Sequence, residues 1–347
     1  MEIADADVNG FPSPTALLVC RPHPKSYMKT LLLTGATGFV GSHVHPALER
    51  AGWHVRCLTR DVKKARHKLP KRTWIEGDIG EAASCERALE GCDAALYLVH
   101  GMGEGGDFRE TELKAARTFA EAASRAKLGR IVYLGGVAPP DGGSEHLRSR
   151  VEVGETLRQG KVPVVELRAS MIVGHGSLSW LIVRDLAARL PVMVLPSWME
   201  SRTEPVAIGD VVVALVAALE LDVTQSEWFD IPGPEALSGK EIVDQAARVM
   251  GLHPPHSLEL PLLTPRLSSL WIRLVTRARW SVAREIVVGL TQDLLAQDDR
   301  FWTRIEHTQR KTLAEAAREA LSAEQAVPVR GLWGWVERAR GIESHYA

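Results

Sequence analysis

The sequence has almost no net charge, few cysteines and no long apolar run, and each shortage excludes a class of protein. Its 347 residues carry a formal net charge of −1, so no basic surface predicts nucleic-acid binding. The four cysteines (Cys20, Cys57, Cys85 and Cys92) lack the paired spacing of a metal site. We therefore expect reduced thiols, no bound metal and a cytoplasmic location. No apolar run reaches the roughly 18 residues that cross a bilayer, so no transmembrane segment is expected.

The N-terminal stretch also lacks a recognisable pattern. Residues 1–27 contain four prolines and no periodicity, and they lack the basic and apolar regions of a secretory signal. We expect a flexible extension there, or an upstream start, because Met28 directly precedes the first predicted strand. The whole chain is 45% apolar and 24% charged, which is typical of a globular protein with a large core.

A glycine-rich turn lies between the first predicted strand, at 31–33, and a helix predicted over 39–50. Gly35 permits a tight turn, Gly38 lets backbone N–H groups approach a pyrophosphate, and Gly41 lets the helix pack close to the sheet. The N-terminus of this helix presents free N–H groups and a partial positive charge to the phosphates. The turn therefore predicts a bound dinucleotide held by residues Gly35, Thr37, Gly38, Phe39, Val40 and Gly41.

The end of the second predicted strand, at 54–59, indicates which dinucleotide binds. Arg60 lies 19 residues after Gly41, near the position where NAD-binding folds carry an acidic residue for the ribose hydroxyls. An arginine there favours a 2′-phosphate, and Lys63 and Lys64 add positive charge. We predict NADP(H) over NAD(H). Asp61 keeps NAD(H) as the alternative, since an inward-facing carboxylate suits an unphosphorylated ribose.

Strand and helix patterns alternate along the remaining chain. Further strands are predicted at 73–76, 94–99, 130–134, 162–167, 191–195, 204–208 and 228–231, with helices at 108–127, 151–158, 211–219 and 238–250. Gly209-Asp210 is expected to cap the helix over 211–219. This alternation predicts an α/β fold with a doubly wound parallel, Rossmann-type sheet. We assign residues 28–176 to the dinucleotide-binding domain and 177–347 to a smaller, mainly helical substrate or interface region that partly continues the sheet.

These motifs together resemble those of an atypical, extended short-chain dehydrogenase/reductase. The chain is most similar to bacterial NAD(P)-binding proteins that resemble the nucleotide-binding accessory subunit of respiratory complex I, with the NmrA-like proteins as a neighbouring group. The resemblance rests on 34–41, 77–78, 97–100, 130–136, 147–150, 167–169 and 263–269, and covers roughly 28 to 300. It implies that Asp78 and Ile79 hold the adenine, and that Val99, His100 and Gly101 line the nicotinamide ribose.

The catalytic residues of that family are the main departure. Active members carry a serine at the end of the fifth strand and a Tyr-x-x-x-Lys on the following helix, where the tyrosine transfers a proton. Here the serine position falls on Gly135 or Gly136, and the second motif falls on His146 and Arg150. Positions i and i+4 share a helix face. An imidazole at His146 or His100 could act as a general acid near neutral pH, whereas Arg150 could bind a ribose but is too basic to exchange protons.

Two hypotheses of different classes remain open. The first is an NADP(H)-dependent oxidoreductase that transfers hydride to or from a small apolar carbonyl or alcohol, with His100, His146 and Arg150 as candidate catalytic residues. The second is a non-catalytic NADPH-binding sensor or assembly protein, which the missing Ser-Tyr-Lys set favours. Tryptophan and arginine are frequent over 267–290, so the segment 260–300 is expected to cover the substrate or to contact a protein partner or a membrane surface.

Overall fold

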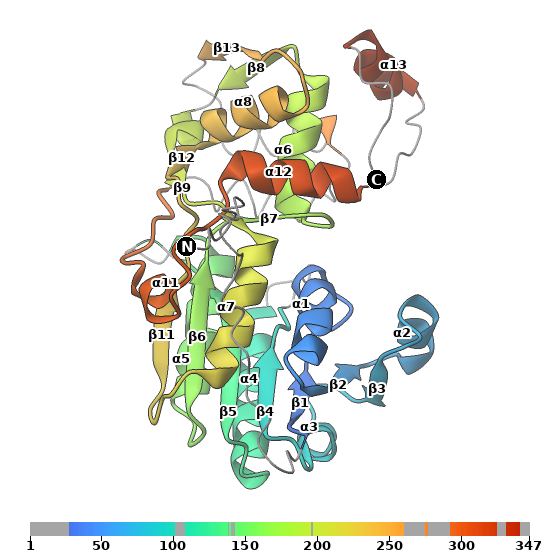
Figure 1. Cartoon of the computed structure of the whole chain (residues 1–347), viewed down its shortest axis with the longest axis vertical. Helices are drawn as coiled ribbons and strands as arrows, with labels where there is room; N and C mark the ends of the chain where they lie inside the picture. The colour runs from blue at the N-terminus through green and yellow to red at the C-terminus, as the bar shows by residue number, and fades with distance from the viewer. Residues whose placement is uncertain are drawn as a thin grey trace, which may run out of the picture.

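The computed structural model describes residues 28–100, 108–137, 139, 143–195, 197–259, 275–276, 292–324 and 331–340. The predicted N-terminal extension and the tryptophan- and arginine-rich segment 267–290, apart from residues 275–276, lie outside this range. Two bodies are visible in Figure 1, one built on a sheet and one mainly helical.

The sheet of the first body is parallel and has seven strands. Their order across the sheet is β11-β6-β5-β4-β1-β2-β3. The strands are β1 (Thr30–Leu33), β2 (His54–Thr59), β3 (Thr73–Glu76), β4 (Ala94–Tyr97), β5 (Arg130–Gly136), β6 (Val164–Ala169) and β11 (Glu227–Asp230). The order reverses between β1 and β4, and ligands bind beyond the carboxyl ends of the strands at such a point. The predicted doubly wound sheet is confirmed.

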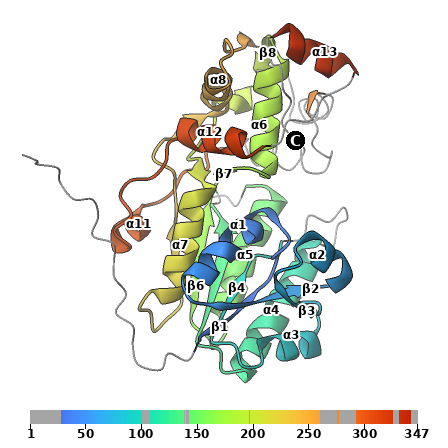
Figure 2. The same cartoon turned by 45° about the vertical axis from the view of Figure 1, so that its right-hand side comes forward.

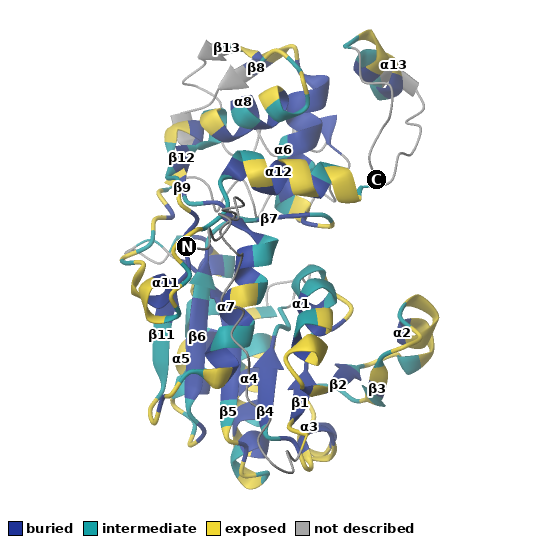
Figure 3. Ribbon diagram, viewed as in Figure 1, coloured by how far each residue is buried: buried dark blue, intermediate teal, exposed yellow. Residues whose placement is uncertain are grey.

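Helices cover both faces of this sheet (Figures 1 and 2). On one face, α1 (Phe39–Arg50) and α7 (Ile208–Glu220) contribute Val44, Leu48, Val211 and Leu215 to a core with the strands. On the other, α3 (Ala82–Leu89), α4 (Phe108–Arg125) and α5 (Glu145–Arg158) bury a second core that includes Phe119. Figure 3 shows the central strands buried between these layers. Burial on both faces explains why β1 and β4 are continuously apolar.

The second body packs three helices around a separate core. These are α6 (Leu178–Arg189), α8 (Gly239–Val249) and α12 (Leu313–Ala323), with Trp180, Ile242 and Ala317 among the buried side chains. The remaining elements are α2 (Val62–Lys68), β7 (Ile172–Val173), β8 (Val192–Leu195), η1 (Ser197–Glu200), β9 (Arg202–Thr203), β10 (Val206–Ala207), β12 (Leu237–Ser238), β13 (His256–Glu259), α11 (Arg300–Arg304) and α13 (Gly331–Ala339). After residue 177 the chain returns to the first body at α7 and β11, as expected of a region that partly continues the sheet. The domain boundary at 176/177 stays a prediction.

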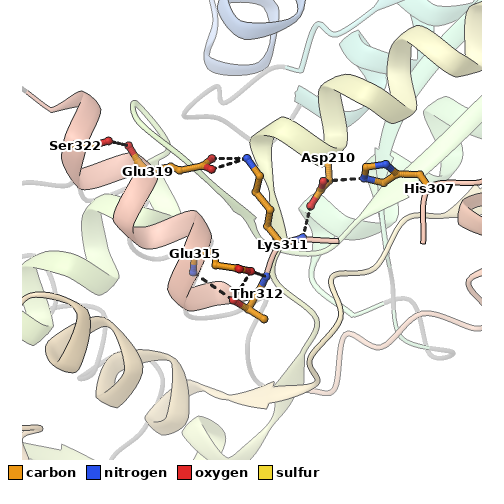
Figure 4. A network of polar contacts seen from close by, with 7 residues as sticks. All are labelled: Asp210, His307, Lys311, Thr312, Glu315, Glu319 and Ser322. Carbon is orange, nitrogen blue, oxygen red and sulfur yellow. Dashed lines mark hydrogen bonds and ion pairs between the residues drawn. The ribbon is translucent and has the colours of Figure 1, made fainter. Parts of the chain in front are cut away.

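The segment 292–312, which we call the strap, fastens α12 to the first body. Its backbone N–H groups at Ala296 and Gln297 donate to the carboxylates of Glu204 and Asp230. The carboxylate of Asp210 accepts from His307 Nε2 and from the Lys311 N–H, each at 2.9 Å (Figure 4). The expectation that Asp210 caps α7 is therefore wrong. The helix begins earlier, at Ile208, and the carboxylate is used by the strap.

Three cysteines lie in the part of the chain that the structure describes. Cys57, Cys85 and Cys92 are free and buried. Burial raises the pKa of the Cys57 and Cys85 thiols to about 12 and raises the pKa of Cys92 as well, which keeps all three thiols protonated. Among the described helices, none is long and apolar enough to cross a bilayer.

Candidate functional site

The glycine-rich turn after β1 fits closely against the end of β4. Gly35 has a φ of +65°, and a Cβ there would lie 2.7 Å from the Leu98 carbonyl oxygen. A Cβ on Gly41 would lie 2.4 Å from the Gly35 carbonyl oxygen. The Thr34 hydroxyl accepts a 3.0 Å hydrogen bond from the Leu98 N–H. Only glycine permits this close packing of turn, strand and helix at both positions.

The N-terminus of α1 leaves its backbone donors free. Its N-cap residue is Gly38, which supplies no side-chain hydrogen bond, and its first turn contains no acidic residue. Among the described residues, no group accepts from the N–H groups of Phe39, Val40 or Gly41. By contrast, serine hydroxyls cap α5 and α6. The free donors, with exposed Thr37 and Gly38 in front of them, fit the pyrophosphate of a dinucleotide.

Arg60 and Asp61, the two residues after β2, differ in their hydrogen bonding. Arg60 is exposed directly after β2. The carboxylate of Asp61 accepts from the Lys64 N–H at 2.9 Å and caps α2. The acidic side chain that would suit an unphosphorylated ribose is therefore engaged with its own helix, while no partner is found for the exposed Arg60 guanidinium within the described part of the chain.

Arg72, directly before β3, supports the turn, and no sequence motif pointed to it. Its Nη1 donates to the Ala36 carbonyl oxygen at 2.7 Å and its Nη2 to the Ser42 carbonyl oxygen at 3.2 Å. It thus ties the glycine-rich turn and the start of α1 to the segment before β3. No local motif signals such a residue, because these contacts span 30 or more positions along the chain.

The residues expected around the adenine and the nicotinamide ribose follow β3 and β4. Asp78 Oδ1 accepts from the Gly80 N–H at 2.8 Å, in a local turn. Ile79 and Val99 are partly buried and pack against the core formed with α3 and α4. These residues therefore lie at the carboxyl edge of the sheet, where the fold binds ligands.

His100, in the segment after β4, is brought together with His146 and Arg150 of α5. His100 Nε2 lies 3.0 Å from the Leu134 carbonyl oxygen of β5. Arg150 Nε donates to His146 Nε2 at 3.1 Å along α5. A Cβ on Gly136 would lie 3.1 Å from Arg150 Cδ, so the arginine covers the carboxyl end of β5. The cluster stands at the carboxyl ends of β4 and β5.

The hydrogen bonds assign one tautomer to each imidazole. Because a carbonyl only accepts, His100 carries its proton on Nε2 and has a lone pair on Nδ1. Because Arg150 Nε only donates, His146 has its lone pair on Nε2 and its proton on Nδ1. Burial and the nearby Arg150 charge lower the pKa of His146 to about 4 and hold that of His100 well below its ordinary value. Both imidazoles are therefore neutral at pH 7, and a general-acid role for either one stays a prediction.

The hydroxyl groups near this cluster are occupied. The Ser144 hydroxyl caps α5 by accepting from the Leu147 N–H, and the Ser149 hydroxyl donates to Glu112. The Tyr133 hydroxyl donates to the Arg150 carbonyl oxygen at 2.9 Å. With Gly135 and Gly136 at the end of β5, the described residues contain no serine–tyrosine pair of the kind that the family uses.

The lowered pKa of His146 predicts acid sensitivity. Between its pKa of about 4 and the ordinary value of 6.5, the unfolded chain binds more protons than the folded one, so stability falls as the pH decreases through this interval. Wild type should lose about 2 kcal/mol more unfolding free energy between pH 7 and pH 4.5 than His146→Gln. Urea unfolding at both pH values measures this, with the exposed His67→Gln as control. Parallel pH profiles for wild type and His146→Gln would contradict the assignment.

Comparison with known proteins agrees with the geometry of the turn. Residues 35–187 match the family model described as NAD(P)H-binding. Ceramide reductase of Caulobacter vibrioides is 28% identical over 229 residues, which are 64% of this chain and 71% of that protein. The mitochondrial NADH-ubiquinone oxidoreductase 40 kDa subunit of Neurospora crassa is 24% identical over 227 residues, 63% of this chain and 60% of that protein.

The fold agrees as well. The enzyme WbmH of Bordetella bronchiseptica, solved in complex with NAD+, superposes with a TM-score of 0.62 at 18% identity, over 85% of this chain and 98% of WbmH. The match extends beyond the glycine-rich turn to both bodies. Residues 35–187 therefore form an NAD(P)H-binding domain, and the chain shares its fold with an enzyme solved with NAD+, as the sequence motifs predict.

Proposed function

We propose that this protein is an NADP(H)-dependent reductase of a carbonyl compound. The observation that carries the proposal is the convergence of His100, His146 and Arg150 beyond β4 and β5, beside a turn built to hold a dinucleotide. Structural scaffolding alone does not require two partly buried imidazoles and a guanidinium at the edge of the sheet where ligands bind.

Each side chain has a role that its hydrogen bonds allow. The N–H groups of Phe39, Val40 and Gly41 would hold the pyrophosphate, Asp78 and Ile79 the adenine, and Val99 the nicotinamide ribose. Bound NADPH supplies the hydride. The free Nδ1–H of His146 can donate to the reacting oxygen, and Arg150 can stabilise negative charge that develops beside it. The His100 Nδ1 lone pair can accept a hydroxyl proton. The proton that completes the alcohol comes from water, because both imidazoles are neutral.

The preference for NADP(H) is supported by the two residues after β2. Arg60 is exposed and could bind a 2′-phosphate, whereas the Asp61 carboxylate caps α2. A guanidinium binds a phosphate group through charge-assisted, often bidentate hydrogen bonds. NADH lacks this phosphate.

Calorimetric titration of the protein with NADPH and NADH tests this proposal. In Arg60→Ala we expect NADPH affinity to fall about 10- to 100-fold, as for a lost charged hydrogen bond, and NADH affinity to stay within about twofold. Arg117→Ala, an exposed arginine on α4, is the matched control and should change neither affinity. Equal affinity for both nucleotides in wild type would disprove the NADP(H) preference. No binding of either would disprove the proposed function.

A non-catalytic NADPH-binding protein is the second candidate, and the end of β5 favours it. A Cβ on Gly135 would lie 3.1 Å from Glu166 Oε1, and one on Gly136 would lie 3.1 Å from Arg150 Cδ, so the usual serine would be a tight fit at either position. Oxidation of bound NADPH by added carbonyl compounds separates the candidates. If turnover is detected and both His100→Ala and His146→Ala leave it intact, the catalytic roles assigned to these histidines are wrong.

A further inference from the structure

Among the described residues, no carboxylate forms an ion pair with the guanidinium of Arg150, unlike those of four other partly or fully buried arginines on α5, β6 and α6. Arg158 and Arg168 both pair with Glu166. Arg184 and Arg189 pair with Asp185, and with Glu324 and Glu337 respectively. Arg150 instead donates its Nε–H to the neutral imidazole of His146. Within the described residues, no group accepts from its Nη1 or Nη2.

This charge is costly without a partner. Burial lowers the pKa of Arg150, while the nearby Tyr133 and Glu112 groups raise it. Because Arg150 is partly buried, its charge is less well hydrated than in bulk water, and an anion that reaches it compensates for part of that loss. Nη1 and Nη2 of Arg150 therefore form a preorganised pair of donors that can bind an anionic acceptor.

The position of the guanidinium indicates which kind of ligand would carry the acceptor group. Nη1 lies 3.5 Å from the place a Cβ of Gly136 would take, at the carboxyl end of β5. The same side chain contacts His146, whose free Nδ1–H we assign to the reacting oxygen. A group bound by Arg150 therefore lies beside His146 at the carboxyl end of β5.

We propose that Arg150 binds a carboxylate next to the reacting carbonyl, so that the substrate belongs to the 2-oxo acids and the product to the 2-hydroxy acids. This inference rests on the proposed function. A planar carboxylate accepts two parallel N–H bonds from the guanidinium fork, which a ribose hydroxyl cannot match. In the reaction the carbonyl carbon gains a hydride, the C=O π pair moves to oxygen, and that oxygen takes a proton from water.

Oxalate is a planar probe of this site that undergoes no reduction. Calorimetric titration of the NADP+-saturated protein with oxalate should show binding that weakens at least tenfold in Arg150→Met. The oxalate affinity of Arg150→Lys should lie between those of wild type and Arg150→Met, because lysine keeps the charge but lacks the forked guanidinium. Arg148→Met is the matched control, since Arg148 is exposed on the same helix, and it should bind oxalate as wild type does. NADP+ affinity and thermal unfolding are measured for every variant.

The outcomes separate this inference from the function on which it rests. If wild type binds NADP+ but not oxalate, or if Arg150→Met binds oxalate as tightly as wild type, the carboxylate site is wrong and the cofactor site stands. If Arg150→Met loses NADP+ affinity tenfold or more, Arg150 serves the cofactor ribose instead. Tighter binding of inorganic phosphate than of oxalate, with the same dependence on Arg150, would overturn the 2-oxo acid class. Failure of wild type to bind NADP+ would defeat the proposed function.

Discussion

Replacing Gly41 with alanine should weaken NADPH binding at least 100-fold. The added Cβ would lie 2.4 Å from the Gly35 carbonyl oxygen and 2.8 Å from Ala36 Cα, both backbone atoms that cannot rotate away. The turn and α1 must therefore move apart, which displaces the row of N–H donors from the phosphates they bind. Calorimetric titration with NADPH measures the loss, and circular dichroism establishes that the variant is folded.

Gly52→Ala is the control for the loss of glycine itself. Gly52 has a φ of +89°, so alanine is strained there by about 1–2 kcal/mol, but nothing lies within 4 Å of the added Cβ. We expect lower stability with NADPH affinity unchanged. Gly38→Ala is a second variant of the turn with a milder contact, 3.2 Å from the Gly35 carbonyl oxygen, and should also lose affinity while remaining folded. If the NADPH affinity of Gly41→Ala is within threefold of that of wild type, close packing of the turn against α1 does not determine the geometry of the pyrophosphate site.

Replacing Glu166 with glutamine should destabilise the protein by about 3–5 kcal/mol, the typical cost of breaking a buried ion pair. The Glu166 side chain is 0% exposed and pairs with Arg158 and Arg168, which are 17% and 13% exposed. The neutral amide would leave two guanidinium groups without their shared counter-charge between β6 and α5. Gly154 makes room for this carboxylate, since a Cβ there would lie 2.5 Å from it.

Glu86→Gln is the matched control for this substitution. Glu86 pairs with Arg125 at 2.7 Å, but both side chains are about half exposed, at 48% and 51%. Water screens this pair, so its loss should cost less than about 1 kcal/mol. Chemical denaturation of both variants at pH 7 provides the comparison. Similar costs for the two substitutions would show that the Glu166 cluster is not a coupled buried network.

The local parts of the nucleotide site could be predicted from the sequence because their residues are contiguous. A strand, a glycine-rich turn and a helix follow one another within 30–50, and each element has its own pattern of apolar residues and glycines. The alternation of strands and helices likewise predicted the parallel sheet. Spacing also placed His146 and Arg150 on one helix face, and the structure joins them by a 3.1 Å hydrogen bond.

Contacts between distant segments could not be predicted in this way. Arg72 reaches the turn across 36 positions, and Asp210 meets His307 across 97. Asp210 directly precedes the predicted helix over 211–219, where an aspartate often caps the helix. Its carboxylate instead accepts hydrogen bonds from His307 and Lys311 of the strap. Spacing identifies neighbours only within one helix or strand.

The amino-acid sequence by itself determined that this protein folds into a doubly wound sheet with a dinucleotide turn, since periodicity and glycine placement are local properties. The tertiary structure alone decided the protonation of His100 and His146 and the absence, among the described residues, of a carboxylate paired with Arg150. A pKa depends on burial and on charges brought from other segments, and neither exists until the chain is folded.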